Sequence, residues 1–268
     1  MTKYLLLSST LAVGVLLATI FAFKGSSQSP PGFLAIMTDF YNCNPEKMAC
    51  SPGMVSTVKE LPDGSRSQYM TRPDGQHIKL IKTGTQHIHV YPDSQQWYAL
   101  TLAHAPGKIS MSHPTQCSDA ASGVTGTTVR TFVDEEKVAG FTAYKYDRVM
   151  PQTGSSSASP HVYSWYFPDI GCAEMQTYML FPDGASTYQK LMSLTLGYND
   201  PSVLTPVGKE TAPVTIFHDL YIKAHTTGTM AVSPDQAEAG WIALWQDPNR
   251  MQAERTQESW WEKTHPAP

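Results

Sequence analysis

Three histidines are the residues whose types and spacing come nearest to a metal site. His87 and His89 are one residue apart, so on a β-strand their side chains point to the same face. His77 precedes them on what reads as the neighbouring strand. Imidazole is a common metal ligand, but no carboxylate in the sequence is placed to complete the set. We therefore expect solvated or half-buried strand histidines and no metal.

Combinations of residues that would carry out hydrolysis are missing. A nucleophilic hydrolase needs an activated Ser or Cys, and no Gly-x-Ser-x-Gly motif occurs. The serines of residues 155–159 lie in a low-complexity stretch. Asp134, Glu135 and Glu136 are contiguous, as in a solvated turn, whereas a catalytic carboxylate pair is split across a cleft. We expect no enzymatic activity and no cofactor.

Aromatic side chains are the best candidates for ligand contacts. Six of them fall in the predicted strands, namely Tyr91, Trp97, Tyr98, Tyr163, Trp165 and Tyr166. Aromatic residues line many hydrophobic pockets, but they also fill the cores of sheets. We take Tyr91, Trp97, Tyr163 and Trp165 as the candidate ligand-binding residues.

The N-terminal segment predicts export. Residues 4–23 carry no charge and follow Lys3. As a helix, a run of this length covers roughly 30 Å, enough to cross a bilayer. A cleaved signal peptide has the same order of charged and apolar residues, with its exit here near Gly25 and Ser27. Residues 1–25 are thus a signal peptide or an N-terminal membrane anchor, and residues 26–32 form a polar linker.

The cysteines fit an exported protein. There are four of them, Cys43, Cys50, Cys117 and Cys172, and four cysteines allow three disulfide pairings. The simplest pairing joins Cys43 to Cys50 and Cys117 to Cys172. Zinc is the alternative, but no Cys-x2-Cys pair exists to favour it.

Short runs of β-forming residues between turns dominate the middle of the chain. Residues 58–102 hold three Pro-Asp turns and one Thr-Gly turn, which predicts a β-meander. A two-residue turn at Thr83 and Gly84 would pair Leu80 with His87 and put His87 and His89 on the face of Ile78 and Leu80. A bulge would reverse that face. A second meander is predicted from about residue 141 to residue 195.

Helices are expected in fewer places. Phe33–Tyr41 reads as a short helix or as extended chain. Asp200 and Pro201 form a helix start, with Asp200 as the N-cap. Val214–Ala224 reads as extended, and Ser233 begins another helix. Residues 231–268 form a helical tail rich in tryptophan, namely Trp241, Trp245, Trp260 and Trp261. Ala105–Thr128 is a long irregular segment.

The net charge of −4 and the pI near 6.1 give no electrostatic footprint for nucleic acid. Charged residues make up 16% of the chain, which is below the usual quarter. Much of the polar surface must therefore come from uncharged side chains, a pattern that favours an extracytoplasmic β-protein.

Four patterns, in this order, resemble the lipoprotein-carrier half-barrel superfamily, the LolA/LolB-like fold. They are Gly84-x3-Ile88-x-Val90-Tyr91-Pro92 followed by Trp97, the strand entry of residues 136–146, the aromatic strand and Pro-Asp-x-Gly turn of residues 165–172, and the Asp-Pro segment of residues 200–208. Together they cover about residues 36 to 218. The loop of residues 43–50, the Ala105–Thr128 segment and the tail after Lys209 depart from the family, and no functional residue transfers.

The resemblance implies a mainly-β fold, a curved antiparallel half-barrel sheet with a few short helices and a helical C-terminal tail. The half-barrel would occupy residues 33–230. Its concavity would bind or carry a lipid, a lipoprotein acyl chain or another apolar ligand. The protein would be periplasmic or otherwise extracytoplasmic, and it would be anchored to the membrane if the N-terminal segment is retained. The alternative is a membrane-tethered scaffold or sensory domain that binds another envelope protein.

Overall fold

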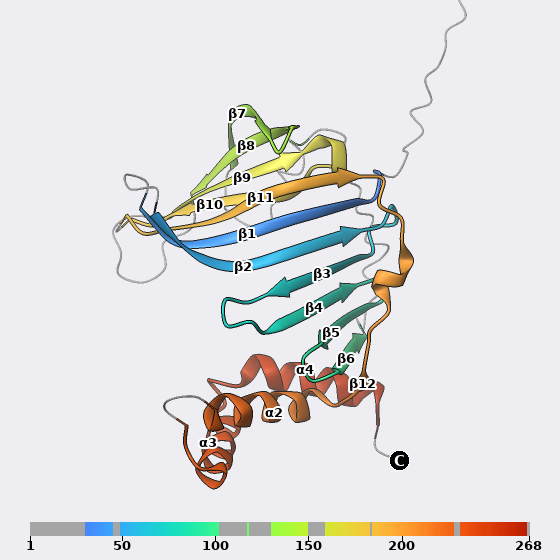
Figure 1. The fold of residues 1–268 in the computed structure, drawn as a ribbon, viewed down its shortest axis with the longest axis vertical. Helices are drawn as coiled ribbons and strands as arrows, with labels where there is room; N and C mark the ends of the chain where they lie inside the picture. The colour runs from blue at the N-terminus through green and yellow to red at the C-terminus, as the bar shows by residue number, and fades with distance from the viewer. Residues whose placement is uncertain are drawn as a thin grey trace, which may run out of the picture.

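The described part of the chain folds into one open, curled sheet of twelve strands with three α-helices and two short 3-10 helices (Figure 1). The computed structural model describes residues 30–44, 49–101, 117, 130–149, 159–182, 184–227 and 231–266. Within these ranges the two edge strands, β7 and β12, do not pair with each other, so the sheet is not a closed barrel. The mainly-β, curved half-barrel fold predicted from the sequence is confirmed.

Most neighbouring elements among the described residues are joined by short connections. The strands of the first half are β1 (Phe33–Asn44), β2 (Ala49–Glu60), β3 (Arg66–Thr71), β4 (His77–Lys82), β5 (Gln86–Tyr91) and β6 (Gln96–Thr101). Those of the second half are β7 (Arg130–Val138), β8 (Phe141–Val149), β9 (His161–Phe167), β10 (Ala173–Leu180), β11 (Ser186–Leu196) and β12 (Lys209–Glu210). The helices are η1 (Pro168–Ile170), η2 (Pro201–Leu204), α2 (Pro213–Thr226), α3 (Pro234–Gln246) and α4 (Gln252–Thr264).

Strand β1 lies inside the sheet and joins two meanders. It pairs with β2 on one side and with β11 on the other, so that β2–β6 and β7–β11 extend away from it in opposite directions. Neighbouring strands are antiparallel except at one edge, where β12 runs parallel to β6. Of the two conformations left open for Phe33–Tyr41, the structure has the extended one.

The turns of the first meander follow from local chemistry. Gly64 and Gly75 adopt positive φ, and each donates its N–H to the carbonyl three residues earlier, at 2.9 Å. The β4–β5 turn differs from the prediction, because Thr83 bonds to Gln86 and Leu80 pairs with His89 instead of His87. The register prediction was therefore wrong by two residues. Since a shift of two keeps every side chain on its face, His87 and His89 still share the face of Leu80.

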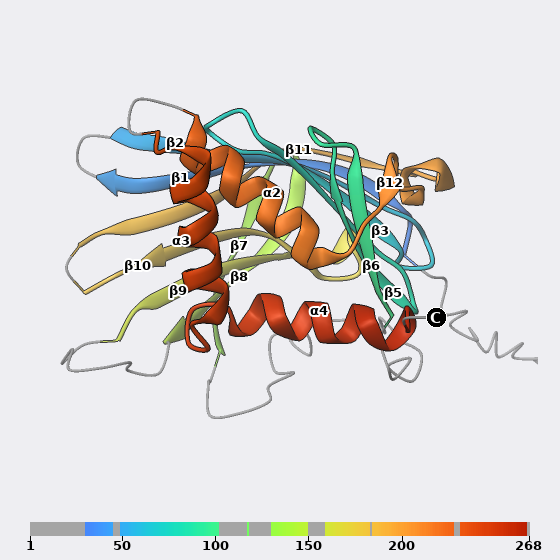
Figure 2. The same cartoon turned by 90° about the horizontal axis from the view of Figure 1, so that it is seen from below.

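The sheet has two faces, which the cross-strand pairs define. The inner face carries the paired row Tyr98, His89, Leu80, Gln68, Val58, Ala35 and Leu194. The outer face carries the adjacent row Trp97, Val90, Lys79, Tyr69, Thr57, Ile36 and Ser193. Figure 1 looks onto the outer face, and Figure 2 shows the sheet arched over the helices, which lie on the inner side.

Helices α2 and α4 cover the inner face at β6. Tyr98 and Leu100 of β6 form a buried cluster with Ile216 of α2, and Trp261 of α4 packs against it. The extended structure predicted for Val214–Ala224 was therefore wrong. Pro213 can occupy a first helical turn, and Ile216 and Leu220 lie one turn apart on one face, so a helix can bury both against the sheet.

The other helix starts were read correctly. Asp200 caps η2 by accepting a hydrogen bond from the Ser202 N–H at 3.0 Å, although only one 3-10 turn follows. Ser233 begins α3 with a capping box that includes Gln236. No helix among the described residues is long and apolar enough to span a membrane. The predicted signal peptide or anchor of residues 1–25 lies outside the described residues, as does the Ala105–Thr128 segment apart from Cys117.

The predicted Cys117–Cys172 disulfide is present, with the two Cα atoms 5.1 Å apart. Both cysteines are buried and cluster with Tyr146 and Tyr166 of β8 and β9. Cys50 is also disulfide-bonded. The side chain of Cys43, its predicted partner, lies outside the described ones.

Replacing Cys117 and Cys172 together by alanine should lower the free energy of unfolding by about 4 kcal/mol, because the bridge closes a loop of sequence separation 55 in the unfolded chain. Chemical denaturation under oxidising conditions measures the difference between wild type and C117A/C172A. Adding a reductant to the wild type should remove most of that difference. A loss below about 1 kcal/mol would show that the bridge constrains the unfolded chain little.

Candidate functional site

An aromatic stack lies on the inner face where α2 and α4 meet the sheet. Tyr98 stacks on His89 with ring centroids 4.7 Å apart and contacts Phe217 of α2 edge-on at 6.0 Å. Its hydroxyl donates to the side chain of Gln257 on α4. The phenol is almost fully buried, and burial raises the pKa of Tyr98 above its usual value. This stack fastens the helices to the sheet and forms one wall of the inner face.

Two small pockets lie beside β4. One, of about 280 Å³, lies between the end of the sheet and α2; Ile78, Tyr91 and Leu220 supply its apolar lining, and its other eight lining residues are polar or charged. The other, of about 170 Å³, is lined by Leu80 together with four longer polar residues, Arg66, Gln68, Lys82 and His87. Ile78 and Leu80 are two residues apart on one strand, so they share a face, and each lines one of the two pockets.

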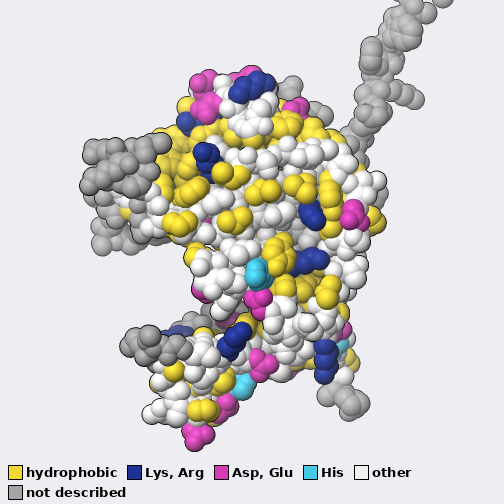
Figure 3. All heavy atoms as spheres, in the orientation of Figure 1, with side chains coloured by type: hydrophobic (Ala, Val, Ile, Leu, Met, Phe, Trp, Pro, Cys, Tyr) yellow, Lys and Arg dark blue, Asp and Glu magenta, His cyan; other side chains and the backbone are white. Residues whose placement is uncertain are grey.

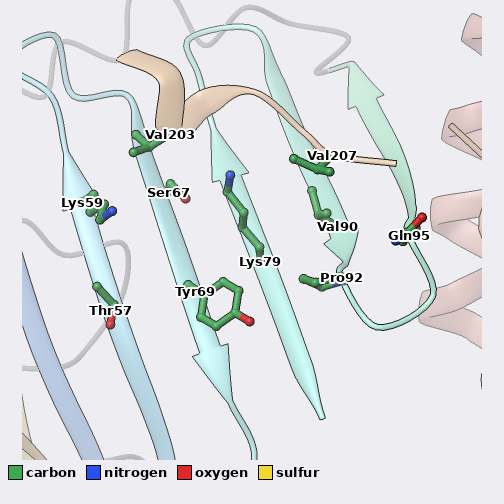
Figure 4. Close-up of a pocket in the computed structure, with 10 residues that line it drawn as sticks. All are labelled: Thr57, Lys59, Ser67, Tyr69, Lys79, Val90, Pro92, Gln95, Val203 and Val207. Carbon is green, nitrogen blue, oxygen red and sulfur yellow. The ribbon is translucent and has the colours of Figure 1, made fainter. Parts of the chain in front are cut away.

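A pocket with a mainly apolar lining lies on the outer face and has a volume of about 550 Å³ (Figure 4). Its floor is made by β2–β5, and one wall is the segment of residues 198–208, which we call the strap. The lining residues are Thr57, Lys59, Ser67, Tyr69, Lys79, Val90, Pro92, Gln95, Val203 and Val207. We call this pocket the outer pocket.

The two lysines give the outer pocket its charge. Its lining includes Lys59 and Lys79 but no carboxylate. Burial, and then the neighbouring charge of Lys59, lowers the pKa of Lys79 from its usual value. The Lys79 ammonium donates to the Thr205 carbonyl of the strap at 3.2 Å. The Lys59 ammonium lies 5.6 Å from the ring centroid of Tyr198.

Hydrophobic side chains also gather on the outer face away from this pocket (Figure 3). Tyr163, Tyr178 and Tyr188 form a row across β9, β10 and β11, with neighbouring rings 6.2 and 5.8 Å apart. Nearer β2, Ile36 and Val55 are exposed by 36% and 42%. The outer face thus carries an apolar area beside a cationic pocket.

The four aromatic residues predicted to bind a ligand do not meet. Tyr91 is on the inner face beside Tyr98, with ring centroids 6.3 Å apart. Trp97 is on the outer face and donates its ring N–H to the Gly208 carbonyl at 3.1 Å, at the end of the strap. Tyr163 and Trp165 lie in the other meander, both within reach of the Lys145 ammonium. Trp165 is buried and donates to Glu136 at 3.0 Å.

The three histidines do not converge either. His77 alternates with Ile78, so it points to the outer face and bonds to Asp93 at 2.8 Å, whereas His87 and His89 point inward. In the described part of the chain, no group of three His, Cys, Asp or Glu side chains is arranged to hold a metal ion.

Sequence reasoning missed the outer pocket. The signal was present in the alternation, since Thr57 and Lys59, then Ser67 and Tyr69, stand on one face of consecutive strands. What the alternation does not indicate is that the strap returns across this face and adds Val203 and Val207 as a wall. That contact joins segments far apart in the sequence, and no local rule predicts it.

No protein-family model and no curated protein match the chain. Solved structures resemble it in fold. An uncharacterized conserved protein from Thermus thermophilus is 10% identical, with a TM-score of 0.41, and the match covers 68% of this chain and 90% of that one. A LolA superfamily protein from Nitrosomonas europaea is 11% identical, with a TM-score of 0.30 and coverage of 66% and 90%. The MucA/MucB complex of Pseudomonas aeruginosa is 13% identical, with a TM-score of 0.37 and coverage of 65% and 54%. One of these structures is thus of a LolA superfamily protein, the superfamily that the four sequence patterns resemble.

Acid should destabilise the protein through His89. Burial, and then the neighbouring His87, lowers the pKa of His89 from 6.5 to about 4. Between those values the unfolded chain binds a proton that the folded chain does not, so stability falls as the pH falls through this window, by up to about 3 kcal/mol. Urea unfolding at pH 7 and at pH 4.5 measures the loss.

The variant His89→Phe keeps a ring against Tyr98 and should remove most of this pH dependence. His225→Gln, at an exposed position on α2, controls for the loss of a histidine as such. An unchanged pH profile in His89→Phe would assign the acid sensitivity to other groups.

Proposed function

We propose that this protein is an exported envelope protein that binds or carries an apolar ligand, such as a lipid or a lipoprotein acyl chain, on the inner face of its curved sheet. The observation that carries the proposal is the pair of pockets beside β4, one of which lies between the sheet and α2. Ile78 lines one and Leu80 lines the other, so a single apolar chain can lie across both. The role is binding without a catalytic step.

The chemistry of the inner face supports an apolar ligand. Met70 pairs with Ile78 and with Ser56, and Met37 continues the row into β1. Met side chains adapt to irregular partners because they are unbranched and flexible. The sheet is open at both edges, so a long ligand is not confined to a closed cavity as it would be in a barrel.

Two features support a location outside the cytoplasm. The uncharged run of residues 4–23 has the composition of a signal peptide or membrane anchor. The Cys117–Cys172 disulfide belongs to an oxidising compartment such as the periplasm. A membrane attachment, if the N-terminal segment is retained, would keep the binding face near lipid.

A second candidate function is a membrane-tethered scaffold or sensory domain that binds another envelope protein. It is favoured by the exposed apolar side chains of the outer face, where Ile36, Val55 and Tyr69 are all more than a third exposed. Trp260 on α4, exposed by 44%, adds a further aromatic contact point. In this function the inner face would be core only.

Native mass spectrometry of the exported chain from Ser29 to Pro268, purified without detergent, tests the proposal. We expect a mass above that of the polypeptide, lost on denaturation and recovered in an organic extract as lipid. A bare polypeptide mass that stays unchanged after incubation with lipid vesicles would reject ligand binding and favour the scaffold function.

Ile78→Trp narrows the pocket between β4 and α2 and should weaken ligand retention about tenfold, which corresponds to about 1.4 kcal/mol. Ile36→Trp makes the same substitution at an exposed outer-face position and should leave retention unchanged. Equal retention in both variants would place the ligand away from the inner face.

A further inference from the structure

The outer pocket is separate from the inner face and has the features of a built site. The sheet divides the two, since Thr57, Tyr69, Lys79 and Val90 belong to the row that faces away from the helices. Two segments distant in sequence line it: the first meander, including the β5–β6 turn with Pro92 and Gln95, and the strap (Figure 4). Its volume of about 550 Å³ lies within the usual range for small-molecule sites.

The polar groups of the outer pocket are donors suited to an anion. Lys59 and Lys79 come from neighbouring outer-face rows, and after burial the charge of Lys59 is the second cause that lowers the pKa of Lys79. No ion pair among the described residues involves either ammonium. Asp200 lies outside the lining of the pocket. Its carboxylate accepts the Ser202 N–H, and this bond, together with the charge of Lys59, lowers the pKa of Asp200. An anion between the two lysines would relieve their repulsion and add charge-assisted hydrogen bonds.

Apolar side chains occupy the rest of the outer pocket. Val90 is 1% exposed in its floor, whereas Val207 on the strap is 71% exposed. Val203 and Pro92 complete the apolar wall. An exposed valine over an apolar floor is covered when a hydrocarbon chain lies between them, and removing that apolar surface from water favours binding.

The wall of the pocket is held in place at both ends. At one end Asp200 caps η2, and Lys79 bonds to Thr205. At the other end Gly208 has a φ of 107° and packs so closely that a Cβ atom would lie 2.1 Å from the Gln95 carbonyl oxygen. Trp97 donates to the Gly208 carbonyl, and β12 continues the sheet. The strap is therefore positioned before any ligand arrives, which lowers the entropic cost of binding.

We propose that the outer pocket binds a single-chain anionic amphiphile, with its carboxylate or phosphate between Lys59 and Lys79 and its hydrocarbon chain between Val90 and Val207. The hydroxyls of Ser67 and Tyr69 are further donors in the same lining. This site goes beyond the proposed inner-face function, because it lies on the opposite face and selects for a negative charge.

Isothermal titration calorimetry of the full-length protein, exported during expression and stripped of bound lipid, tests the proposal. The probes are oleate, oleyl alcohol and a mono-oleoyl phosphate, each below its critical micelle concentration. We expect at least one anion to bind more than about tenfold more tightly than the alcohol. Binding of oleate alone identifies the head group as a carboxylate, and binding of the phosphate alone identifies it as a phosphate. Binding of both shows that the pocket accepts either head group.

The double variant Lys59→Met/Lys79→Met should weaken anion binding about 100-fold, at about tenfold for each ammonium. Lys190→Met is the matched control, since Lys190 pairs with Thr38 on the same outer face but does not line the pocket. Val207→Asp, at a highly exposed position where folding is not at risk, should weaken the anion about tenfold by placing a carboxylate beside it.

Four results would overturn the assignment. The first is that neither anion binds the folded wild type, and the second is that the alcohol binds as tightly as the anions. The third is that both the double variant and Val207→Asp still bind the anion. The fourth is that Ile78→Trp is the only variant that loses anion binding. The last result would assign the amphiphile to the inner face. Loss of lipid retention in Ile78→Trp, with anion binding intact, would instead separate the two sites.

Discussion

Strand β1 pairs with two partners, and this double pairing holds the sheet together. Ala35 has no exposed surface and stands between Val58 of β2 and Leu194 of β11, so the two meanders meet across its small side chain. A bulge between Ile36 and Met37 bends the sheet at this point, as bulges do. Without these contacts each meander would be a smaller sheet with an exposed edge. The curvature that creates an inner and an outer face begins here.

Each face of the sheet is specialised because its side chains meet different neighbours. The inner face receives α2 and α4, whose contacts with Tyr98 and Leu100 bury aromatic surface at the β6 end. On the outer face, the described part of the chain places the strap at that end, where Leu204 packs against the cluster of Ile81, Ile88 and Val90. Helices can cover a broad area of sheet, whereas one extended segment covers little. The outer face therefore keeps an open pocket and exposed apolar side chains.

Electrostatics distinguishes the outer pocket from the larger inner pocket, whereas the smaller inner pocket also has cationic residues and no carboxylate in its lining. The smaller inner pocket mixes Arg66 and Lys82 with the imidazole of His87, and the larger one includes Asp93 and Asp219 beside Lys223. Positive charge in the larger inner pocket is therefore offset by carboxylates. The outer pocket holds two ammonium groups and no carboxylate in its lining. Burial and the charge of Lys59 therefore disfavour the charged form of Lys79 and lower its pKa. Such a cost is tolerated where a ligand or partner relieves it.

The Pro-Asp turns, the alternation along single strands and the fold class could be predicted from the sequence alone, whereas the β4–β5 turn could not. Gly64 and Gly75 act through local backbone geometry, and the face that His87 and His89 share follows from a period of two. The helix at residues 214–224 needed the tertiary context, because burial against Tyr98 outweighs a weak local preference. The same context dispersed the four candidate aromatic residues, Tyr91, Trp97, Tyr163 and Trp165, and brought Lys59 and Lys79 beneath Val207. Those outcomes depend on contacts between distant segments, which no short stretch of sequence encodes.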